Sequence, residues 1–503
     1  MITAVLWSDL KFHIGYVEAG EAMLVLAVFS FALWALFRLL LNGWIRASLA
    51  TGMWSFFLLN GSEIIDFMPE SSLVKSLIYV LVLFILVDLT RRIPGQIESL
   101  FAVNFWTNVL LILPVLFLCL RTAQGQIWLE ETRNGAQFPS TPLAALEMQS
   151  GPDVWHLVFD RYGDRETLLQ AYDVDNSDFY DALRARGFEV PEYAFANYQR
   201  TAHSLASTLN ADYLDHFSGK LRYAHDPVPL YNALGRNRAL STFKQNGYLS
   251  YWSGSWWNPT RVSDDADRNI NFRALPQLVS VVFRRSFPGL IAEQLGLPFG
   301  DVRKDQCLRV HYKFDALVEL ARNEDRKYIF AHFLVPHPPY VINADGTCRS
   351  LAVARGATRS ENYSQQLSYT NDRILQLVDQ IIAGPRPSVI LIHADEGPWP
   401  EPHIGNEDSI GTDPVKINWH TLSVEKKKQK LGILMATRLV DGSPHEALST
   451  PVNLYPFILN REFGQSLGMR EDRVYMFQDP SNLYTFKEVT TETLSDRSNH
   501  PNQ

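Results

Sequence analysis

Four long apolar segments fill the first 120 residues, and they constrain the fold of this chain more than any other feature. They run roughly over residues 22–41, 44–60, 74–90 and 100–120. The first segment, AMLVLAVFSFALWALFRLLL, is long enough to cross the ~30 Å hydrocarbon core of a bilayer at ~1.5 Å per residue. It contains no A-x-A-like cleavage site, so it reads as an anchor. We predict a transmembrane domain of about four helices over residues 1–120; buried helices of a soluble domain are the alternative.

The charges beside these segments predict their orientation. Arg38 and Arg46 flank the first connection, and Arg91 and Arg92 flank the third. The other side carries the acidic residues Asp9, Glu18, Glu21, Glu63, Asp66 and Glu70. The positive-inside rule then places the first and third connections in the cytoplasm and everything after residue ~121 outside. We expect a multi-pass protein of the bacterial inner (plasma) membrane whose C-terminal half is periplasmic or extracellular.

The charge pattern argues against nucleic acid as a partner. The net charge is −8, and the longest cationic run is EKKKQK at residues 425–430, which we interpret as a solvated loop. Cys307 and Cys348 could pair if they lie outside the cytoplasm, whereas Cys119 falls in an apolar segment. The sequence contains no C-x-x-C spacing that would support a zinc site. It does not determine the oligomeric state.

The second half of the chain alternates short apolar runs with segments of helical spacing. The runs are VWHLVFD at 154–160, KYIFAHFLV at 327–335 and SVILIHAD at 388–395, and a helical stretch spans 369–382. This alternation predicts an α/β fold with a mainly parallel central sheet flanked by helices. We expect a connector over 121–150, a catalytic domain over 151–487 and a polar, mobile tail over 488–503.

Each of the three apolar runs leads into residues that can bind a metal or an anion. Asp160 ends the first run, His337 follows the second, and Asp395 with Glu396 follows the third. Open α/β sheets bind ligands beyond the carboxyl ends of their strands. Buried acids are costly unless they are paired or bind a metal, so this pattern predicts a divalent cation site.

A hydroxyl residue at the start of a helix supplies a candidate nucleophile. In NYQRTAHSLASTLNADYL, residues 197–214, Thr201 precedes apolar residues at helical spacing. Helix N-termini favour anions, and a nearby metal would lower the pKa of the hydroxyl. The alternative for Thr201 taken by itself is an ordinary N-cap.

Together these segments resemble the alkaline phosphatase superfamily, and in particular its membrane-anchored sulfatase-like branch related to lipoteichoic acid synthases and phosphoethanolamine transferases. The resemblance covers residues 152–478, and it includes KLGILMATRLVDG and LSTPVNLYPFILNREFG from the late core. It implies an alkaline-phosphatase-like domain in which Thr201 is the nucleophile, Asp160, Thr201, Asp395 and Glu396 bind the metal, and His337 contacts the substrate phosphate.

The metal motif departs from the family pattern, and the bundle of about four helices is one span short of the five common in relatives. The usual Asp-His-Gly motif reads Asp395-Glu396-Gly397 here, which makes the ligand set all oxygen. By ligand hardness this favours Mn²⁺ or Mg²⁺ over Zn²⁺ and admits Ca²⁺. Neither Cys307 nor Cys348 fits the C-x-P-x-R motif of formylglycine sulfatases, which argues against sulfate ester hydrolysis by that route.

Several other residues have a structural and a functional interpretation. His332 and His393 lie within apolar runs, as core histidines do, whereas His403 could reach the site. Asn197 and Tyr198 are expected to shape the nucleophile loop. The aromatic loop that contains Trp252, Trp256 and Trp257 is either core or a substrate or membrane contact.

The resemblance and the residues together predict a membrane-anchored, metal-dependent phospho-group transferase or hydrolase with a threonine nucleophile. A membrane lipid would be the donor, and an envelope glycan or lipid the acceptor. The alternative is a non-catalytic envelope protein with a degenerate metal site. A transporter is disfavoured because the apolar segments lack central charges.

Overall fold

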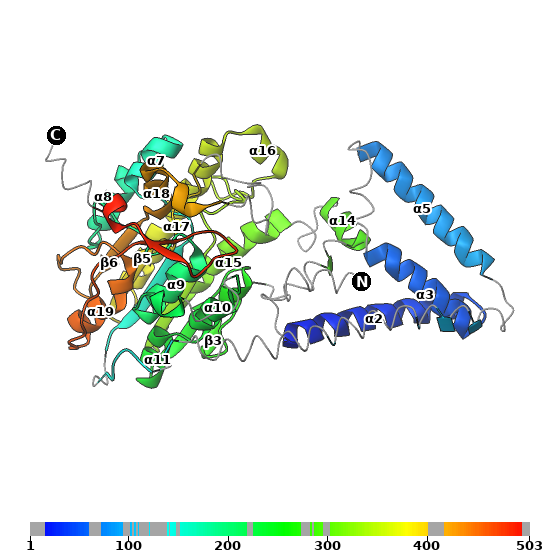
Figure 1. Ribbon diagram of the computed structural model, residues 1–503, viewed down its shortest axis with the longest axis horizontal. Coiled ribbons are helices and arrows are strands. Elements are labelled where there is room, and N and C mark those ends of the chain that lie inside the picture. The colour runs from blue at the N-terminus through cyan, green and yellow to red at the C-terminus, as the bar shows by residue number, and fades with distance from the viewer. Residues whose placement is uncertain are drawn as a thin grey trace. The chain divides into compact units, whose positions relative to one another are not determined.

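The computed structural model of the chain (Figure 1) describes the following residues: 16–59, 72–93, 101–102, 105–106, 109, 120, 138–139, 141–146, 151–218, 225–272, 282–283, 286–294, 302–400 and 417–494. The chain divides into two compact units. The first comprises residues 1–130 and 273–302, and the second comprises 131–272 and 303–503. The catalytic domain predicted over 151–487 therefore includes a segment that groups with the N-terminal unit instead.

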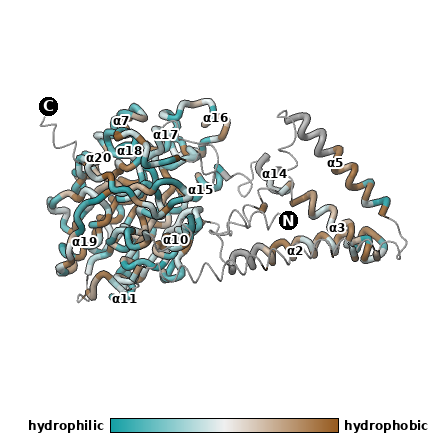
Figure 2. The backbone as a smooth tube through the Cα atoms, in the orientation of Figure 1, coloured by the Kyte–Doolittle hydropathy of each residue, from teal (hydrophilic) through white to brown (hydrophobic). Residues whose placement is uncertain are grey.

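The first unit consists of apolar helices. The described helices are α2 (Tyr16–Leu40), α3 (Trp44–Leu59), α5 (Ser72–Arg92) and α14 (Phe287–Gln294). Nε1 of Trp34 in α2 donates to Oγ of Ser48 in α3 at 3.2 Å. Nε1 of Trp54 in α3 donates to Oγ1 of Thr90 in α5 at 3.0 Å. These bonds join neighbouring helices whose coloured residues in Figure 2 are largely hydrophobic.

One helix of the described residues is long and apolar enough to cross a membrane. It is the part of α2 from Met23 to Leu40, with a mean hydropathy of 2.3 and 6% of its residues buried. The predicted spans at 44–60 and 74–90 coincide with helices α3 and α5, but neither passes the same test. The predicted span at 100–120 lies mostly outside the described residues. The four-helix bundle stays a prediction.

The second unit is built on a six-stranded sheet. Among the described residues its order is β3-β2-β4-β1-β5-β6, parallel except for the β5–β6 pair. The strands are β1 (Asp153–Phe159), β2 (Leu249–Ser253), β3 (Arg268–Asn269), β4 (Lys327–Phe333), β5 (Ser388–His393) and β6 (Met435–Arg438). A small antiparallel sheet pairs β7 (Tyr475–Phe477) with β8 (Phe486–Glu488). The prediction of a mainly parallel α/β sheet is confirmed.

The centre of the sheet is buried on both faces. Every residue of β1, β4 and β5 is buried, and successive side chains of a strand point to opposite faces. Helices must therefore cover both sides, as in α/β folds generally (Figure 1). These three strands are the three apolar runs of the sequence, and they lie side by side in the order β4-β1-β5.

Helices precede, connect and follow the strands of the second unit. They are α7 (Arg165–Tyr172), α8 (Ser177–Arg184), α9 (Thr201–Asn210), α10 (Val228–Gly235), α11 (Arg238–Gln245), α12 (Asn258–Arg261), α15 (Val302–Ala321), α16 (Leu351–Gly356), α17 (Arg359–Ile382), α18 (Val424–Leu431), α19 (Leu454–Glu462) and α20 (Thr490–Thr493). Helix α17 begins ten residues before the predicted stretch because Oγ1 of Thr358 caps it by accepting from the Glu361 N–H at 3.1 Å.

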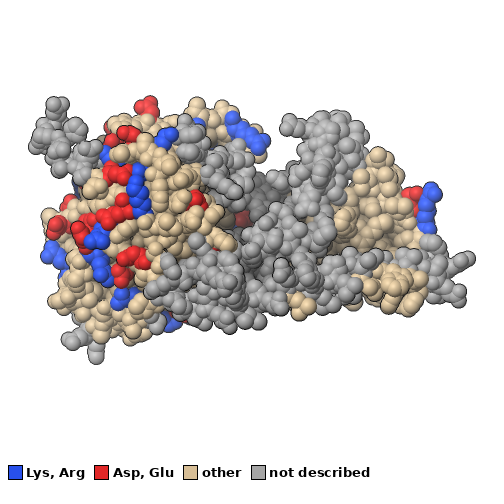
Figure 3. Space-filling view, viewed as in Figure 1, with Lys and Arg blue, Asp and Glu red and all other residues tan. Residues whose placement is uncertain are grey.

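Two predictions about polar segments are wrong. The cationic run at 425–430 is not a solvated loop, because it forms helix α18 with Lys427 and Lys430 buried. The beginning of the expected mobile tail is folded, because Val489 and Thr493 are buried and Glu492 forms an ion pair with Lys427. Residues 495–503 lie outside the described part. Elsewhere on the visible face of this unit, acidic and basic residues are interspersed (Figure 3).

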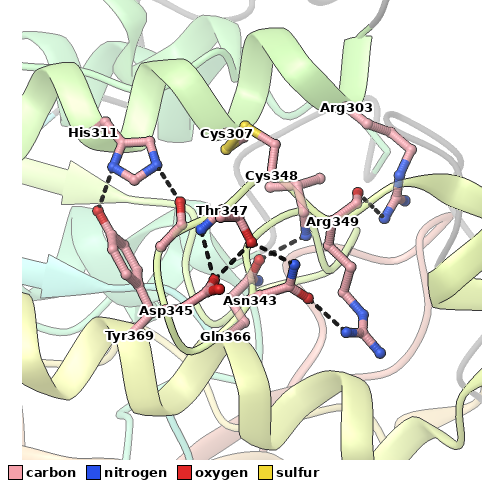
Figure 4. Close-up of a disulfide and its surroundings, with 12 residues drawn as sticks. Arg303, Cys307, His311, Asn343, Asp345, Thr347, Cys348, Arg349, Gln366 and Tyr369 are labelled. Atoms are coloured by element: carbon pink, nitrogen blue, oxygen red, sulfur yellow. Dashed lines mark hydrogen bonds between the residues drawn. A yellow bond between two sulfur atoms is a disulfide. The ribbon is translucent and has the colours of Figure 1, made fainter.

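Cys307 of α15 and Cys348 form a disulfide (Figure 4). Their Cα atoms lie 5.7 Å apart, and the bridge links positions 41 residues apart in sequence. His311, one turn further along α15, bonds to Gly346 O at 2.9 Å and to the Tyr369 hydroxyl at 2.7 Å. The bridge and these bonds hold the segment that follows β4 against α15 and α17.

Candidate active site

Three side chains from the sheet centre converge at the carboxyl ends of the strands. Asp160 follows β1, His332 is the penultimate residue of β4, and Asp395 lies two residues beyond β5. One ligand atom of each lies within 4.8 Å of the others, and all three residues are buried. The parallel register makes this possible, because Val158 of β1 pairs with His332 on one side and with His393 on the other. The predicted convergence of Asp160 and Asp395 is confirmed, and His332 joins them.

Polar atoms without partners gather at this point. Among the described residues, Oδ1 of Asp160, Nε2 of His332 and both carboxylate oxygens of Asp395 make no hydrogen bond. An unsatisfied buried polar group costs about 1–3 kcal/mol, so such groups are rare unless something binds them. Two carboxylates and one imidazole that face one another fit a divalent cation.

The acidity of the two aspartates points the same way. Burial and the neighbouring Glu396 raise the pKa of Asp160 to about 7, against the opposing effects of Arg161 and Lys430. Burial, Asp160 and Glu396 raise the pKa of Asp395 well above its ordinary value. Two ionised carboxylates this close repel each other, so without a cation at least one of them tends to stay protonated. A bound cation would stabilise the ionised form of both.

His332 is held in the form that a metal ligand needs. Burial lowers its pKa to about 4, so the ring is neutral at pH 7. Its Nδ1 lies 2.9 Å from Oγ1 of Thr260, and this oxygen is also 2.9 Å from Oγ of Ser255. If Nδ1 donates to Thr260, then Nε2 presents its lone pair to the two aspartates, the usual arrangement behind a metal-bound histidine. From its apolar run His332 was predicted to be a core residue, and its position beside the two aspartates was missed.

Thr201 is the first residue of α9 and lies beside Asp395. Burial raises the pKa of Asp395, and the nearby Thr201 hydroxyl acts in the opposite direction with a smaller effect. The backbone of the preceding Arg200 is extended and caps the helix without a side-chain bond. Thr201 is partly exposed, unlike the buried residues that follow it in α9. The hydroxyl therefore lies at the positive end of the helix dipole, next to the acidic group.

Glu396 differs from its neighbours because cations already surround it. Its Oε1 lies 2.8 Å from Nζ of Lys430, 3.0 Å from Nε of Arg161 and 3.2 Å from Nε1 of Trp399. Burial alone would raise its pKa, but Lys430 and Arg161 outweigh burial and bring the value to about 2. Glu396 does not belong to the group of converging ligand atoms, although its Oε2 has no hydrogen-bond partner among the described residues. A metal contact by Glu396 stays a prediction for that one oxygen.

Gly397 explains how Lys430 reaches Glu396. The Gly397 N–H donates to Lys430 O, and Nζ of Lys430 donates to Gly397 O, both at 2.9 Å. A Cβ at Gly397 would lie 2.4 Å from Gln429 O and 2.7 Å from Gly432 O. The glycine after the two acids thus lets the end of α18 pack directly against the strand end.

Beside the acidic group of Asp160, His332 and Asp395 lies a cationic half of the site, which consists of Arg161, Arg200 and Lys430 around the buried indole of Trp399. The charged groups of Arg161, Arg200 and Lys430 lie 5.0, 4.9 and 5.3 Å from the centre of the Trp399 ring. Arg161 has a left-handed backbone with φ of 59°, a conformation that costs a side-chain-bearing residue of the order of 1 kcal/mol. The turn after β1 thus places Asp160 in the acidic group and the next residue, Arg161, in the cationic half. None of the four residues of this cationic half was predicted from the sequence.

His337 lies near the cationic half, on a loop between two cis prolyl bonds, Val335–Pro336 and Pro338–Pro339. Burial and Arg161 lower its pKa well below the ordinary value, with Glu396 acting in the opposite direction. Its Nδ1 contacts Pro338 O, and its own carbonyl accepts from Nε2 of Gln366 at 3.0 Å. The role of His337 as a phosphate contact stays a prediction.

The remaining sequence candidates are structural or fall outside the described residues. His393 is a core histidine, bonded to His156 at 2.8 Å and to Ala394 O at 2.7 Å. Asn197 accepts from Val452 N, and the Tyr198 hydroxyl accepts from Leu214 N, so both shape the loop before α9 as predicted. His403 lies outside the described residues.

The tryptophans of the predicted aromatic loop have different surroundings. Trp252 is fully buried in the core. Trp257 is partly buried, and its ring centre lies 6.3 Å from that of His332. The loop therefore borders the candidate metal site through Trp257.

The chain is similar to known proteins in sequence and in structure. A sulfatase family model matches residues 152–459. No curated protein matches the sequence. Among solved structures, the C-terminal periplasmic domain of EcEptC from Escherichia coli in complex with zinc is similar at 12% identity and a TM-score of 0.46, covering 71% of this chain and 98% of that domain. Phosphonate monoester hydrolase of Agrobacterium radiobacter is similar at 11% identity and a TM-score of 0.41, covering 65% and 80%.

Proposed function

The chain belongs to the sulfatase family, and from this premise we propose that it is a membrane-anchored, metal-dependent enzyme that transfers or hydrolyses a phospho group through Thr201. The family match agrees with the resemblance predicted from the sequence and supports a general role as a hydrolase or transferase. The substrate, the nucleophile and the anchor are the parts that we propose here.

One observation carries the proposal: the unpartnered ligand atoms of Asp160, His332 and Asp395 face one another beside the Thr201 hydroxyl. These three residues would hold a divalent ion, and the ion would supply positive charge that lowers the pKa of the hydroxyl. His332 brings a nitrogen ligand that was not predicted from the sequence. Zn²⁺ is therefore compatible with the site together with Mn²⁺ and Mg²⁺.

The chain's own residues account for the transfer. Oγ1 of Thr201 forms a bond to phosphorus as the bond from phosphorus to the donor alcohol breaks, and the hydroxyl proton ends on the departing alcohol. An acceptor hydroxyl or water then displaces Thr201 and returns a proton to it. Arg161, Arg200 and Lys430 lie around Trp399, and we propose that they and His337 stabilise the phosphoryl oxygens as these gain charge.

The proposed compartment and partners follow from the anchor and the disulfide. Helix α2 contains an apolar stretch long enough to span a bilayer, and the Cys307–Cys348 bridge is typical of proteins outside the cytoplasm. We propose a multi-pass protein of the bacterial inner membrane with its catalytic domain on the periplasmic or extracellular side. A membrane glycerophospholipid is the proposed donor, and an envelope glycan or lipid is the proposed acceptor.

One observation favours the non-catalytic alternative. Lys430 and Arg161 engage Oε1 of Glu396, so the fourth predicted metal ligand is already neutralised by protein cations. If Asp160, His332 and Asp395 bind a metal too weakly for catalysis, the protein would keep the fold of the family and act as a non-catalytic member of an envelope complex.

Mass spectrometry of the Thr201 peptide distinguishes the two. Purified protein is incubated with mixed phospholipids and Mn²⁺ or Zn²⁺, beside Thr201→Ala. We expect a mass increment on Thr201 that equals the transferred group and is absent from the variant. An unmodified Thr201 in a protein that binds no metal, as judged by calorimetry, would support the non-catalytic alternative.

A further inference from the structure

A segment in the middle of the catalytic sequence groups with the apolar N-terminal unit. The chain leaves the second unit after Phe272, at the end of the β3 region, and returns to it at Arg303 in α15. Residues 273–302 between them belong to the first unit. Within this segment the structure describes helix α14, Phe287–Gln294, and a few residues before it.

Helix α14 is attached to the apolar helices by an aromatic contact. The ring of Phe287 lies 5.7 Å from that of Phe57 in α3, and it packs on the buried pair formed by Phe57 and Leu86 of α5. Oγ of Ser286 accepts from the Gly289 N–H at 3.2 Å and so caps the start of the helix. The contact and the cap together fix α14 within the same unit as α2, which carries the membrane-spanning stretch.

The length and surface of α14 fit a membrane surface and not a span. Eight residues at ~1.5 Å each make a helix of about 12 Å, well short of the ~30 Å hydrocarbon core. Its sequence, FPGLIAEQ, is mostly apolar, yet Ile291 is 40% exposed. In the sequence, Arg284 and Arg285 come directly before the capping residue Ser286, and arginine favours the lipid headgroup level over the bilayer centre.

We propose that α14 lies in the interface of the bilayer, with Ile291 directed to the acyl chains, and that it gives the catalytic chain a second attachment to the lipid surface. The partner is a phospholipid membrane. The proposal rests on the membrane anchoring of α2 proposed above. An interfacial helix of this kind is buried about 5–10 Å into the boundary between headgroups and acyl chains. It would keep the catalytic unit close to a lipid donor.

Depth measurement in the full-length protein tests this. Cys119 is replaced by Ser, the native disulfide is kept, and one nitroxide label is attached at a time through Phe31→Cys, Ile291→Cys or Met469→Cys. Phe31 lies in the middle of the spanning part of α2, and Met469 is an exposed residue of the catalytic unit, with side chains 67% and 45% exposed. Each variant is reconstituted into phosphatidylethanolamine and phosphatidylglycerol vesicles, and collision with oxygen and with a nickel chelate is compared.

We expect the label at 291 to lie between the other two, shielded from nickel but shallower than the label at 31. If the label at 31 lies deep in the bilayer but the label at 291 is as accessible to nickel as the label at 469, α14 is not at the interface. That result would overturn this proposal and leave the anchoring of α2 supported. A label at 291 as deep as that at 31 would also overturn the proposal. If neither 31 nor 291 is in lipid, the anchoring premise fails together with it.

Discussion

Nζ of Lys430 lies 2.8 Å from Oε1 of Glu396, and both side chains are buried. Glu396 occupies the position where the family resemblance places a histidine. Nε of Arg161 contacts the same oxygen at 3.0 Å, so two cations hold the acid. Lys430 comes from helix α18, more than thirty residues later in the chain.

Removal of this cation should destabilise the fold strongly. In Lys430→Met, Glu396 keeps Arg161 but loses its closest partner, and breaking a buried pair from one side typically costs about 3–5 kcal/mol. Thermal or denaturant unfolding measures the loss. Lys426→Met, on the same helix but only half-buried, should change the stability by less than about 1 kcal/mol. The double variant Lys430→Met/Glu396→Gln should regain part of the stability, and a strictly additive result would contradict the pairing.

Metal affinity should depend on the residue behind His332. Thr260→Val removes the oxygen that orients Nδ1 of His332, and loss of such a partner typically weakens metal binding about 10–100-fold. Titration calorimetry with Mn²⁺ and Zn²⁺ measures the change. Thr370→Val is the matched control, because Thr370 is equally buried and its hydroxyl bonds to Gln366 O within helix α17. Equal affinities of the two variants would show that Thr260 does not orient a metal-binding His332.

Metal binding should compete with protons near neutral pH. Burial and Glu396 raise the pKa of Asp160 to about 7, so in the metal-free protein this carboxyl is mostly protonated at pH 6 and mostly ionised at pH 8. Because the metal binds the ionised form, the affinity should fall as the pH drops below about 7. Calorimetry in two buffers of different ionisation enthalpy should detect a larger release of protons at pH 6 than at pH 8, with Asp160 accounting for most of one proton of the difference. A release that does not change with pH would rule out Asp160 as the titrating ligand.

A buried hydrogen-bond chain should have a direction that mutations reveal. Ala394 O can only accept, so His393 donates to it from Nδ1 and accepts at Nε2 from Nε2 of His156. Nδ1 of His156 then accepts from the Tyr455 hydroxyl, and Tyr455 accepts from Tyr328.

Tyr455→Phe therefore leaves a histidine acceptor and a tyrosine donor unsatisfied, whereas Tyr328→Phe leaves one acceptor unfilled. We expect Tyr455→Phe to lower the free energy of unfolding by about 1–3 kcal/mol and Tyr328→Phe by clearly less. Nitrogen NMR should find the proton on Nδ1 of His393 and on Nε2 of His156. Equal costs of the two substitutions would contradict this direction.

The strand ends were predictable because their signals are local. An apolar run shows in the sequence where a buried strand ends. The acid that follows it, Asp160 or Asp395, can be read directly from the next residues. Parallel strands then bring those acids to one edge whatever their separation along the chain. Thr201 was found in the same way, from the start of a helical pattern.

The two strand histidines show where such reasoning fails. His332 and His393 both pair in register with Val158, on opposite sides of β1, and both are buried in apolar runs. Nε2 of His393 bonds to His156, and its Nδ1 bonds to Ala394 O. Nε2 of His332 has no hydrogen-bond partner among the described residues and lies 3.6 Å from Oδ2 of Asp160. Only the packing of neighbouring elements distinguishes them.

The sequence by itself determined the apolar N-terminal segments, the α/β pattern, the acids at the strand ends and the threonine at the start of α9, because each depends on periodicity or on the end of a single element. The tertiary structure alone decided the charge around Glu396 and the position of His332 beside the two aspartates. Lys430 belongs to a run that looks solvated until α18 packs against Gly397, and only then does its ammonium group lie beside the acid. Burial and proximity set the charge state of a group, and both depend on residues that are distant in sequence.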